Sequence, residues 1–186
     1  MKNTIETELT GERLIVWNIK EANDLYNLGF YGKPVGIPKP KPGQEFHAPL
    51  VLDLMEGIYL LEKKVIKVVD SRIRHPLKKT QLQKIAAKTY TNFKRAYLIY
   101  QDLRGKKYIV APGIKFGSDF AVYERGPGID HAPFIISVRS RKDSMGPFEI
   151  VRAGRLATTV RKQFIIAAPK KKGKKPNYFI FKWFKA

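Results

Sequence analysis

Three polar residues in the second half of the chain have side chains that could do chemistry together: Tyr123, His131 and Lys162. A phenolate can accept a proton, an imidazole can donate one, and an ammonium group is a fixed cation. RNA carries its own nucleophile, the 2′-hydroxyl. Its cleavage needs a base for that proton, an acid for the leaving 5′-oxygen and a cation for the growing phosphate charge. The three residues therefore offer the parts for RNA cleavage without a metal.

Taken one at a time, each of these residues has a commoner structural role. Tyr123 ends a strand-like run, where a tyrosine usually packs or stacks across strands. His131 follows a Gly-Pro-Gly loop, where a side chain can be presented to a ligand, but a surface histidine without a function is commoner there. The ordinary pKa of a phenol is about 10, so cations such as Arg125, Arg155 and Lys162 would have to lower it before Tyr123 serves as a base. The residue types alone do not decide whether these three residues form an active site.

The elements that must position these residues are short strands and one helix. We expect strands at Tyr108–Val110, Phe120–Tyr123, Phe134–Val138, Phe164–Ala167 and Tyr178–Phe184, and a helix from Phe148 to Lys162 with Pro147 in its first turn. On that helix Arg155 and Lys162 stand two turns apart and share a face. Such a pair can bind phosphate or an RNA base, but more commonly it forms only a solvated basic face.

The first half has the pattern of a small mixed α/β unit. We expect strands at Leu14–Trp17, Leu50–Leu52 and Val65–Val69, a helix from Asn18 to Leu28, and a second helix capped by Asp53 that runs to about Lys63. A long helix, or a pair of helices, is expected from Thr80 to about Leu103. The predicted fold class is mixed α/β (α+β). It has a small N-terminal α/β domain at residues 1–77 and, at 78–186, a nuclease-like domain with a central mixed sheet flanked by helices.

The charge of the chain points to an anionic polymer. Lys and Arg number 36 against 16 Asp and Glu, a formal net charge of +20. The excess is concentrated in residues 94–186, which hold 21 basic and 6 acidic side chains. Nucleic acid is the simplest partner for such a surface. A protein that is merely basic stays open as the alternative.

Several classes of site are excluded or not expected. The absence of cysteine rules out disulfides, thiolate nucleophiles and Cys-type zinc sites, and the three histidines lack metal-ligand spacing. We therefore expect neither a metal nor a cofactor. No apolar run reaches the length of a membrane span, and the first residues lack the apolar core of a signal peptide. We expect no membrane partner and a cytoplasmic location.

Residues 95–186 resemble the catalytic domain of the archaeal tRNA-splicing endonucleases. The motifs that carry the resemblance are Tyr97–Arg104, Gly113–Phe120, Val122-Tyr123, His131-Ala132 and Arg155–Lys162. The first half resembles the family's N-terminal domain more loosely, in Leu25–Gly32 and Leu50–Leu61.

The resemblance implies a metal-independent endoribonuclease that excises introns from precursor tRNA at bulge–helix–bulge junctions, leaving 2′,3′-cyclic phosphate and 5′-hydroxyl ends. It makes Tyr123 the general base, His131 the general acid and Lys162 the cation at the transition state. The alternative is a noncatalytic RNA-binding or assembly subunit of the same complex. The family clamps a flipped bulge base between two flat side chains, which match Arg155 and, more loosely, Trp183. Trp183 could instead belong to the core. We also expect Arg125 and Lys115 to contact RNA.

The loop between the last two expected strands departs from the family pattern. Homotetrameric members carry acidic residues there and dock them into a basic cleft of another subunit. Here residues 169–176 contain five lysines and no acid. Two such loops would repel a basic cleft, so we infer that a second, noncatalytic subunit supplies the acidic loop in an α2β2 heterotetramer. The lysines could also bind tRNA phosphates, and both interpretations stay open.

Overall fold

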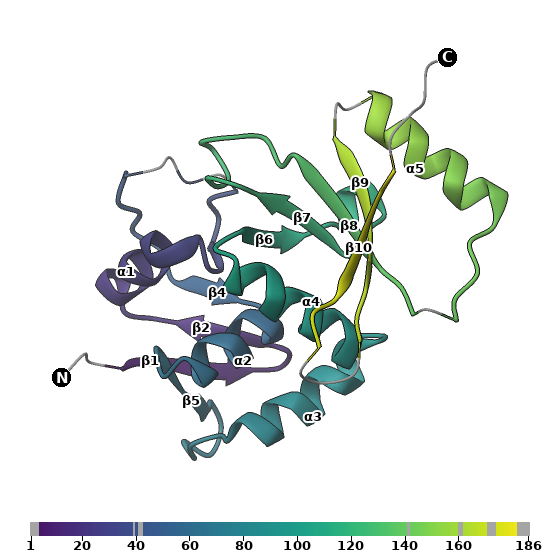
Figure 1. Ribbon diagram of the computed structural model, residues 1–186. Coiled ribbons are helices and arrows are strands. Elements are labelled where there is room, and N and C mark those ends of the chain that lie inside the picture. Colours follow the sequence, from purple (N-terminus) through teal and green to yellow (C-terminus); the bar gives the residue numbers. More distant parts are fainter. Residues whose placement is uncertain are drawn as a thin grey trace. The chain divides into compact units, whose positions relative to one another are not determined.

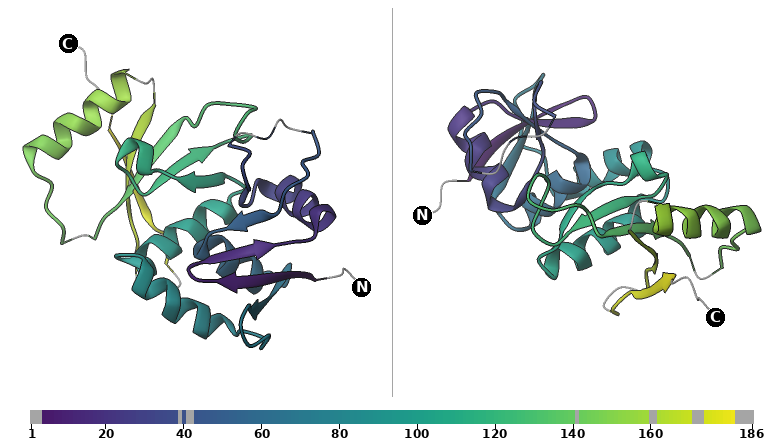
Figure 2. Two further views of the ribbon diagram at one scale, coloured as in Figure 1. Left: turned by 180° about the vertical axis from the view of Figure 1, so that it is seen from behind. Right: turned by 90° about the horizontal axis from the view of Figure 1, so that it is seen from above.

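The chain folds into two compact units, each built on its own mixed five-stranded sheet with helices (Figures 1 and 2). The computed structural model describes residues 4–38, 40, 43–140, 142–159, 162–170 and 174–181. The units are Met1–Phe93 and Lys94–Ala186. The mixed α/β class expected from the sequence is confirmed. The contacts assign residues 78–93 to the first unit, and the boundary expected after residue 77 stays a prediction.

The first unit has a sheet of strand order β3-β4-β2-β1-β5, in which β1 and β5 run parallel and the other pairs are antiparallel. Helix α1 packs on β2 and β4, and α2 packs on β2, β5 and α3. Its elements are β1 (Ile5–Thr10), β2 (Arg13–Val16), α1 (Ile19–Gly29), β3 (Lys33–Pro34), β4 (Leu50–Leu52), α2 (Leu54–Glu62), β5 (Ile66–Asp70) and α3 (Lys79–Thr89).

Helices α1 and α2 begin where the sequence provides caps. The side chain of Asn18 accepts a hydrogen bond from the backbone N–H of Glu21. Asp53 and Glu56 form a reciprocal capping box at the start of α2. One turn further on, α2 approaches the sheet closely, because a Cβ atom at Gly57 would lie 1.8 Å from the side chain of Leu14. Glycine at this position lets the helix pack directly on β2.

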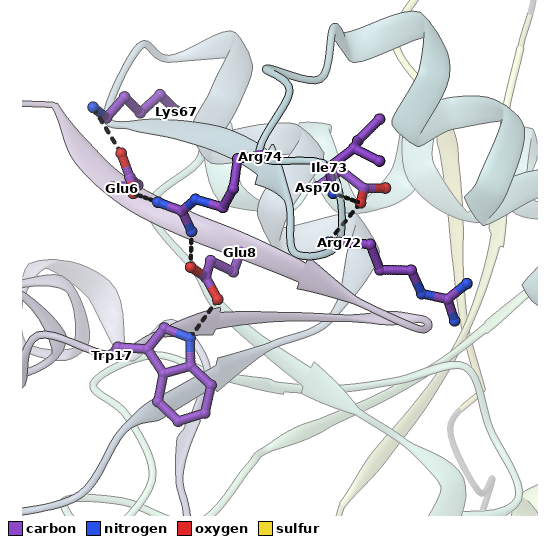
Figure 3. A network of polar contacts seen from close by, with 8 residues as sticks. All are labelled: Glu6, Glu8, Trp17, Lys67, Asp70, Arg72, Ile73 and Arg74. Carbon is purple, nitrogen blue, oxygen red and sulfur yellow. Dashed lines mark hydrogen bonds and ion pairs between the residues drawn. The ribbon is translucent and has the colours of Figure 1, made fainter.

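Strand β1 was not expected, and it lies inside the sheet between β2 and β5. Its inward face carries Thr7 and Leu9, both buried, whereas Glu6 and Glu8 point the other way. Figure 3 shows the network on that outer face. Glu6 pairs with Lys67 and Arg74, Glu8 pairs with Arg74, and the Trp17 indole N–H donates to Glu8. The network ties the turn after β5 to β1 through exposed and partly exposed groups, and ion pairs of this kind each contribute little to stability.

The second unit has a sheet of strand order β10-β9-β8-β7-β6, in which β8 and β9 run parallel and the other pairs are antiparallel. The Tyr100 ring of α4 packs on the Phe120 ring of β7, with 6.1 Å between centroids. Within the part of the chain that is described, no helix combines the length and the apolar character needed to cross a membrane. The elements are α4 (Phe93–Gly105), β6 (Ile109–Pro112), the 3-10 turn η1 (Ile114–Phe116), β7 (Phe120–Tyr123), β8 (Phe134–Val138), α5 (Pro147–Thr159), β9 (Gln163–Ala168) and β10 (Asn177–Phe181).

Candidate active site

Three adjacent strands bring the candidate residues to one edge of the second sheet. Strand β7 ends at Tyr123, and the antiparallel β8 starts at Phe134, beside that end. Strand β9 runs parallel to β8, so its start at Gln163 lies at the same edge, with Gln163 paired to Phe134. His131 precedes β8 by three residues, and Lys162 directly precedes β9. Figure 1 shows β7, β8 and β9 side by side.

Lys162 is anchored at the entrance to β8. Its Nζ donates a 2.5 Å hydrogen bond to the carbonyl of Ala132 and lies 5.3 Å from the centre of the Phe116 ring. Burial lowers the pKa of the Lys162 ammonium from its ordinary value, and the negative charge of Asp130 acts in the opposite direction. The ammonium therefore sits beside the residue that follows His131, on an aromatic surface.

The helix expected from about Phe148 to Lys162 does not include Lys162: the described part of α5 is Pro147–Thr159, and Lys162 itself is not helical. The backbone N–H of Gln163 donates to Pro133, so strand pairing has replaced helical bonding by that point. Lys162 therefore does not continue the helical face of Arg155. Arg155 belongs to α5, whereas Lys162 belongs to the segment that leads into β9.

The turn that seats Phe116 depends on a glycine. A Cβ atom at Gly113 would lie 2.8 Å from the backbone of Phe120, so only glycine lets η1 fold back against the start of β7. Phe116 and Tyr123 pack against the same buried cluster, whose members are Ala121, Ala132, Ile135 and Phe164. The Gly-Ile-Lys-Phe segment thus places the aromatic ring under Lys162.

Tyr123 is half-buried at the end of β7, and its environment differs from the one expected. Burial raises the pKa of the Tyr123 phenol, and the charge of Asp130 raises it further. A base at neutral pH would need this pKa lowered by cations such as Arg125, Arg155 and Lys162, but the direction is the opposite. Because both causes raise the pKa, the Tyr123 phenol keeps its proton near neutral pH.

The loop from Arg125 to Asp130 connects β7 to the segment that carries His131. The Asp130 carboxylate accepts the backbone N–H of Arg125 at 3.0 Å and that of Gly126 at 2.8 Å. His131 is exposed, and the next residue, Ala132, is buried. Sequence reasoning missed Asp130. The available signal was an aspartate in a Gly-Pro-Gly loop, a residue type that commonly bonds nearby backbone groups in turns.

The candidate RNA contacts are more scattered. Lys115 in η1, Arg125 in the loop and Arg155 on α5 are all exposed. Trp183 lies outside the described residues. No group of three or more His, Asp or Glu side chains that could hold a metal ion is present in the described ranges.

Comparison with known proteins decides the family. Residues 5–79 match the model of the tRNA intron endonuclease N-terminal domain, and residues 93–177 match that of the tRNA intron endonuclease catalytic C-terminal domain. The chain belongs to the tRNA-splicing endonuclease family. Membership supports an endonuclease that acts in tRNA intron excision.

Relatives in the family are similar over nearly their full length. The tRNA-splicing endonuclease of Hyperthermus butylicus is 43% identical over 181 residues, which cover 97% of this chain and 99% of the relative. That of Sulfurisphaera tokodaii is 38% identical over 178 residues, covering 96% and 98%. That of Sulfolobus acidocaldarius is 35% identical over 182 residues, covering 97% and 99%. The resemblance inferred from the sequence motifs is confirmed.

Proposed function

We propose that this chain is a metal-independent endoribonuclease that excises introns from precursor tRNA at bulge–helix–bulge junctions. The products would be 2′,3′-cyclic phosphate and 5′-hydroxyl ends. The observation that carries the proposal is the meeting of the ends of β7, β8 and β9, which supports a shared site for Tyr123, His131 and Lys162. A cytoplasmic location stays a prediction from the sequence.

In this proposal the RNA supplies the nucleophile and the protein moves two protons. The 2′-oxygen attacks the adjacent phosphorus while Tyr123 takes its proton. The bond to the 5′-oxygen breaks, and His131 gives that oxygen a proton. Lys162 faces the charge that grows on the non-bridging phosphate oxygens. The raised pKa of Tyr123 leaves little phenolate at neutral pH, and the phenolate that forms is correspondingly a stronger base.

The basic surface of the second half fits this substrate. Lys115, Arg125 and Arg155 are exposed cations of the same unit as the site, and contacts of this kind to phosphates position RNA without reading its sequence. We propose that Arg155 stacks on a bulged base, since guanidinium planes stack well on unpaired bases. Trp183 is the proposed second half of that clamp.

We further propose that the chain works with a noncatalytic subunit in an α2β2 assembly. In the loop between β9 and β10, Lys174 and Lys175 are exposed. A loop of this charge suits RNA phosphates or an acidic partner surface. It does not suit a basic cleft on a second copy of the chain.

The proposal is tested by cleavage of a bulge–helix–bulge RNA in EDTA. The wild-type chain, in its purified assembly, is expected to cut both junctions and to leave 5′ ends that a polynucleotide kinase can phosphorylate directly. His131→Ala and Lys162→Ala should each slow cleavage by about 10²-fold or more. Lys94→Ala, an exposed lysine of α4, serves as the control.

Two results would contradict the proposal. Robust cleavage that survives both substitutions removes the assigned site. RNA binding without cleavage by the wild-type assembly favours the alternative, a noncatalytic RNA-binding or assembly subunit.

A further inference from the structure

Asp130 directly precedes His131 in the sequence, and its carboxylate acts electrostatically on both Tyr123 and Lys162. We infer that Asp130 is a positioning residue: it closes the loop 125–130 and thereby fixes His131 and the Ala132 carbonyl relative to Lys162. The inference rests on the proposed function. It adds a group that acts on the site without touching the reacting atoms.

The loop is held by a dense set of bonds that converge on Asp130. Its two carboxylate oxygens each take one backbone N–H, from Arg125 and from Gly126. The backbone N–H of Asp130 itself donates to the carbonyl of Gly126 at 3.1 Å, as does that of Ile129. Gly126 and Gly128 have φ angles of +134° and +88°, which suit glycine. Asp130 thus joins the two ends of a turn that other residue types would strain.

The segment after Asp130 is fixed at its far end by the site itself. His131 is followed by Ala132, which is 3% exposed and whose carbonyl accepts the Lys162 ammonium. The exposed His131 therefore stands between two anchored neighbours, the loop closure at Asp130 and the lysine contact at Ala132. A backbone anchored on both sides of His131 leaves the residue less freedom to lose when its imidazole meets the leaving oxygen.

The charge of Asp130 acts on the other two members of the site as well. It opposes the loss of the Lys162 proton that burial favours, and it raises the pKa of the Tyr123 phenol. Other charged groups of nearby segments are Lys115 in η1, Glu124 directly after β7, and Arg125 in the loop. Asp130 both closes the loop and acts electrostatically on Tyr123 and Lys162.

The test compares Asp130→Asn with two matched variants of the full chain. Asparagine keeps the shape and one acceptor oxygen but loses the charge and the second acceptor. Asp130→Glu keeps the charge and moves the carboxylate. Glu124→Gln removes a neighbouring exposed carboxylate that lies outside the loop closure. The measurements are kcat and KM on the bulge–helix–bulge RNA, amide hydrogen exchange at Arg125 and Gly126, and the NMR titration of the Lys162 13Cε signal, assigned by its loss in Lys162→Met.

For Asp130→Asn we expect kcat to fall on the order of tenfold to a hundredfold with KM changed by less than about threefold. Amide exchange at Arg125 or Gly126 should be faster, and Lys162 should titrate at a lower pH than in the wild type. Glu124→Gln should leave the cleavage rate and the loop exchange unchanged. Asp130→Glu should restore the Lys162 titration more than it restores kcat.

The inference is overturned if Asp130→Asn cleaves within about twofold of the wild type. It is also overturned if a thermal melt shows that the variant is already unfolded at the assay temperature, which would make Asp130 a folding residue only. Exchange and titration are measured on the chain without RNA. A wild-type assembly that does not cleave therefore fails the proposed function, while these two readouts still decide whether Asp130 closes the loop and holds the Lys162 proton.

Discussion

At the scale of single residues, burial pushes the two best-described members of the site toward their neutral forms. The pKa of Lys162 is lowered and the pKa of Tyr123 is raised, in both cases first by burial. The carboxylate of Asp130 offsets the effect on Lys162 and adds to the effect on Tyr123. An RNA phosphate beside Lys162 would favour the ammonium further, because an adjacent negative charge stabilises the cation.

Lys162→Met tests whether this residue serves function rather than stability. The pKa of Lys162 is lower in the native state than in the unfolded chain. The protonated lysine therefore costs some stability at neutral pH, and this cost disappears as the pH rises toward 10.5. At pH 7 the variant should cleave about 10²-fold more slowly or worse. Its free energy of unfolding in urea should stay within about 1 kcal/mol of the wild type. Lys94→Met is the matched control, and a loss of stability above about 3 kcal/mol would make Lys162 a structural residue.

At the scale of elements, the close approach of α2 to β2 gives a sharp prediction. Alanine usually stabilises a helix relative to glycine by up to about 1 kcal/mol. At Gly57, however, the added Cβ would lie 1.8 Å from Leu14, which is fully buried. Gly57→Ala should therefore lower the free energy of unfolding of the first unit by about 1–3 kcal/mol, measured by urea denaturation.

Gly105→Ala is the control for that change. Gly105 is the last residue of α4, and nothing lies within 4 Å of an added Cβ there. This variant should be as stable as the wild type or slightly more stable. Equal destabilisation by the two substitutions would show that backbone conformation, rather than the contact with Leu14, sets the effect.

Most elements could be predicted from the sequence because their patterns are local. The runs Phe120–Tyr123 and Phe134–Val138 are rich in apolar and β-branched residues, and both form strands with those bounds. Strand β1 was missed because Thr7, a polar residue, fills a buried position and the strand reads as polar. Lys162 was wrongly placed in the helix because the pairing of the next residue, Gln163, with Phe134 is a long-range contact.

The candidate site could be predicted only as a set of residue types. Its assembly depends on the parallel register of β8 and β9, which no local pattern specifies. Neither the lysine contact with the Ala132 carbonyl nor the electrostatic role of Asp130 leaves a trace in spacing. The family motifs supplied what the local patterns could not.

At the scale of the whole molecule, both units contain tyrosines with a raised pKa. They are Tyr26, Tyr90, Tyr123 and Tyr178. Burial and the carboxylate of Asp53 raise the pKa of Tyr90 to about 12. Between about pH 10 and 12 the unfolded chain has lost this proton while the native state keeps it, so stability falls as the pH rises.

Tyr90→Phe tests this linkage against the wild type. Urea denaturation of the two proteins at pH 8 and pH 11 should show a smaller alkaline loss of stability in the variant, since phenylalanine has no proton to lose. Equal losses in the two proteins would mean that Tyr90 titrates alike in the folded and unfolded states.

The proposed α2β2 assembly can be tested by the mass of the chain when it is purified alone. Because the loop between β9 and β10 is basic, the chain alone should not form an active homotetramer. Light scattering should report a species smaller than four copies of the 21.3 kDa chain. An active tetramer of this chain alone would contradict the α2β2 proposal.

The central claim is that the RNA's own 2′-hydroxyl attacks the scissile phosphate of the RNA, in the site formed by Tyr123, His131 and Lys162. The most direct measurement is cleavage, in EDTA, of a bulge–helix–bulge RNA with one 2′-deoxynucleotide on the 5′ side of one scissile bond. We predict that this junction stays intact while the unmodified junction in the same molecule is cut. Cleavage of both junctions at equal rates would contradict the account.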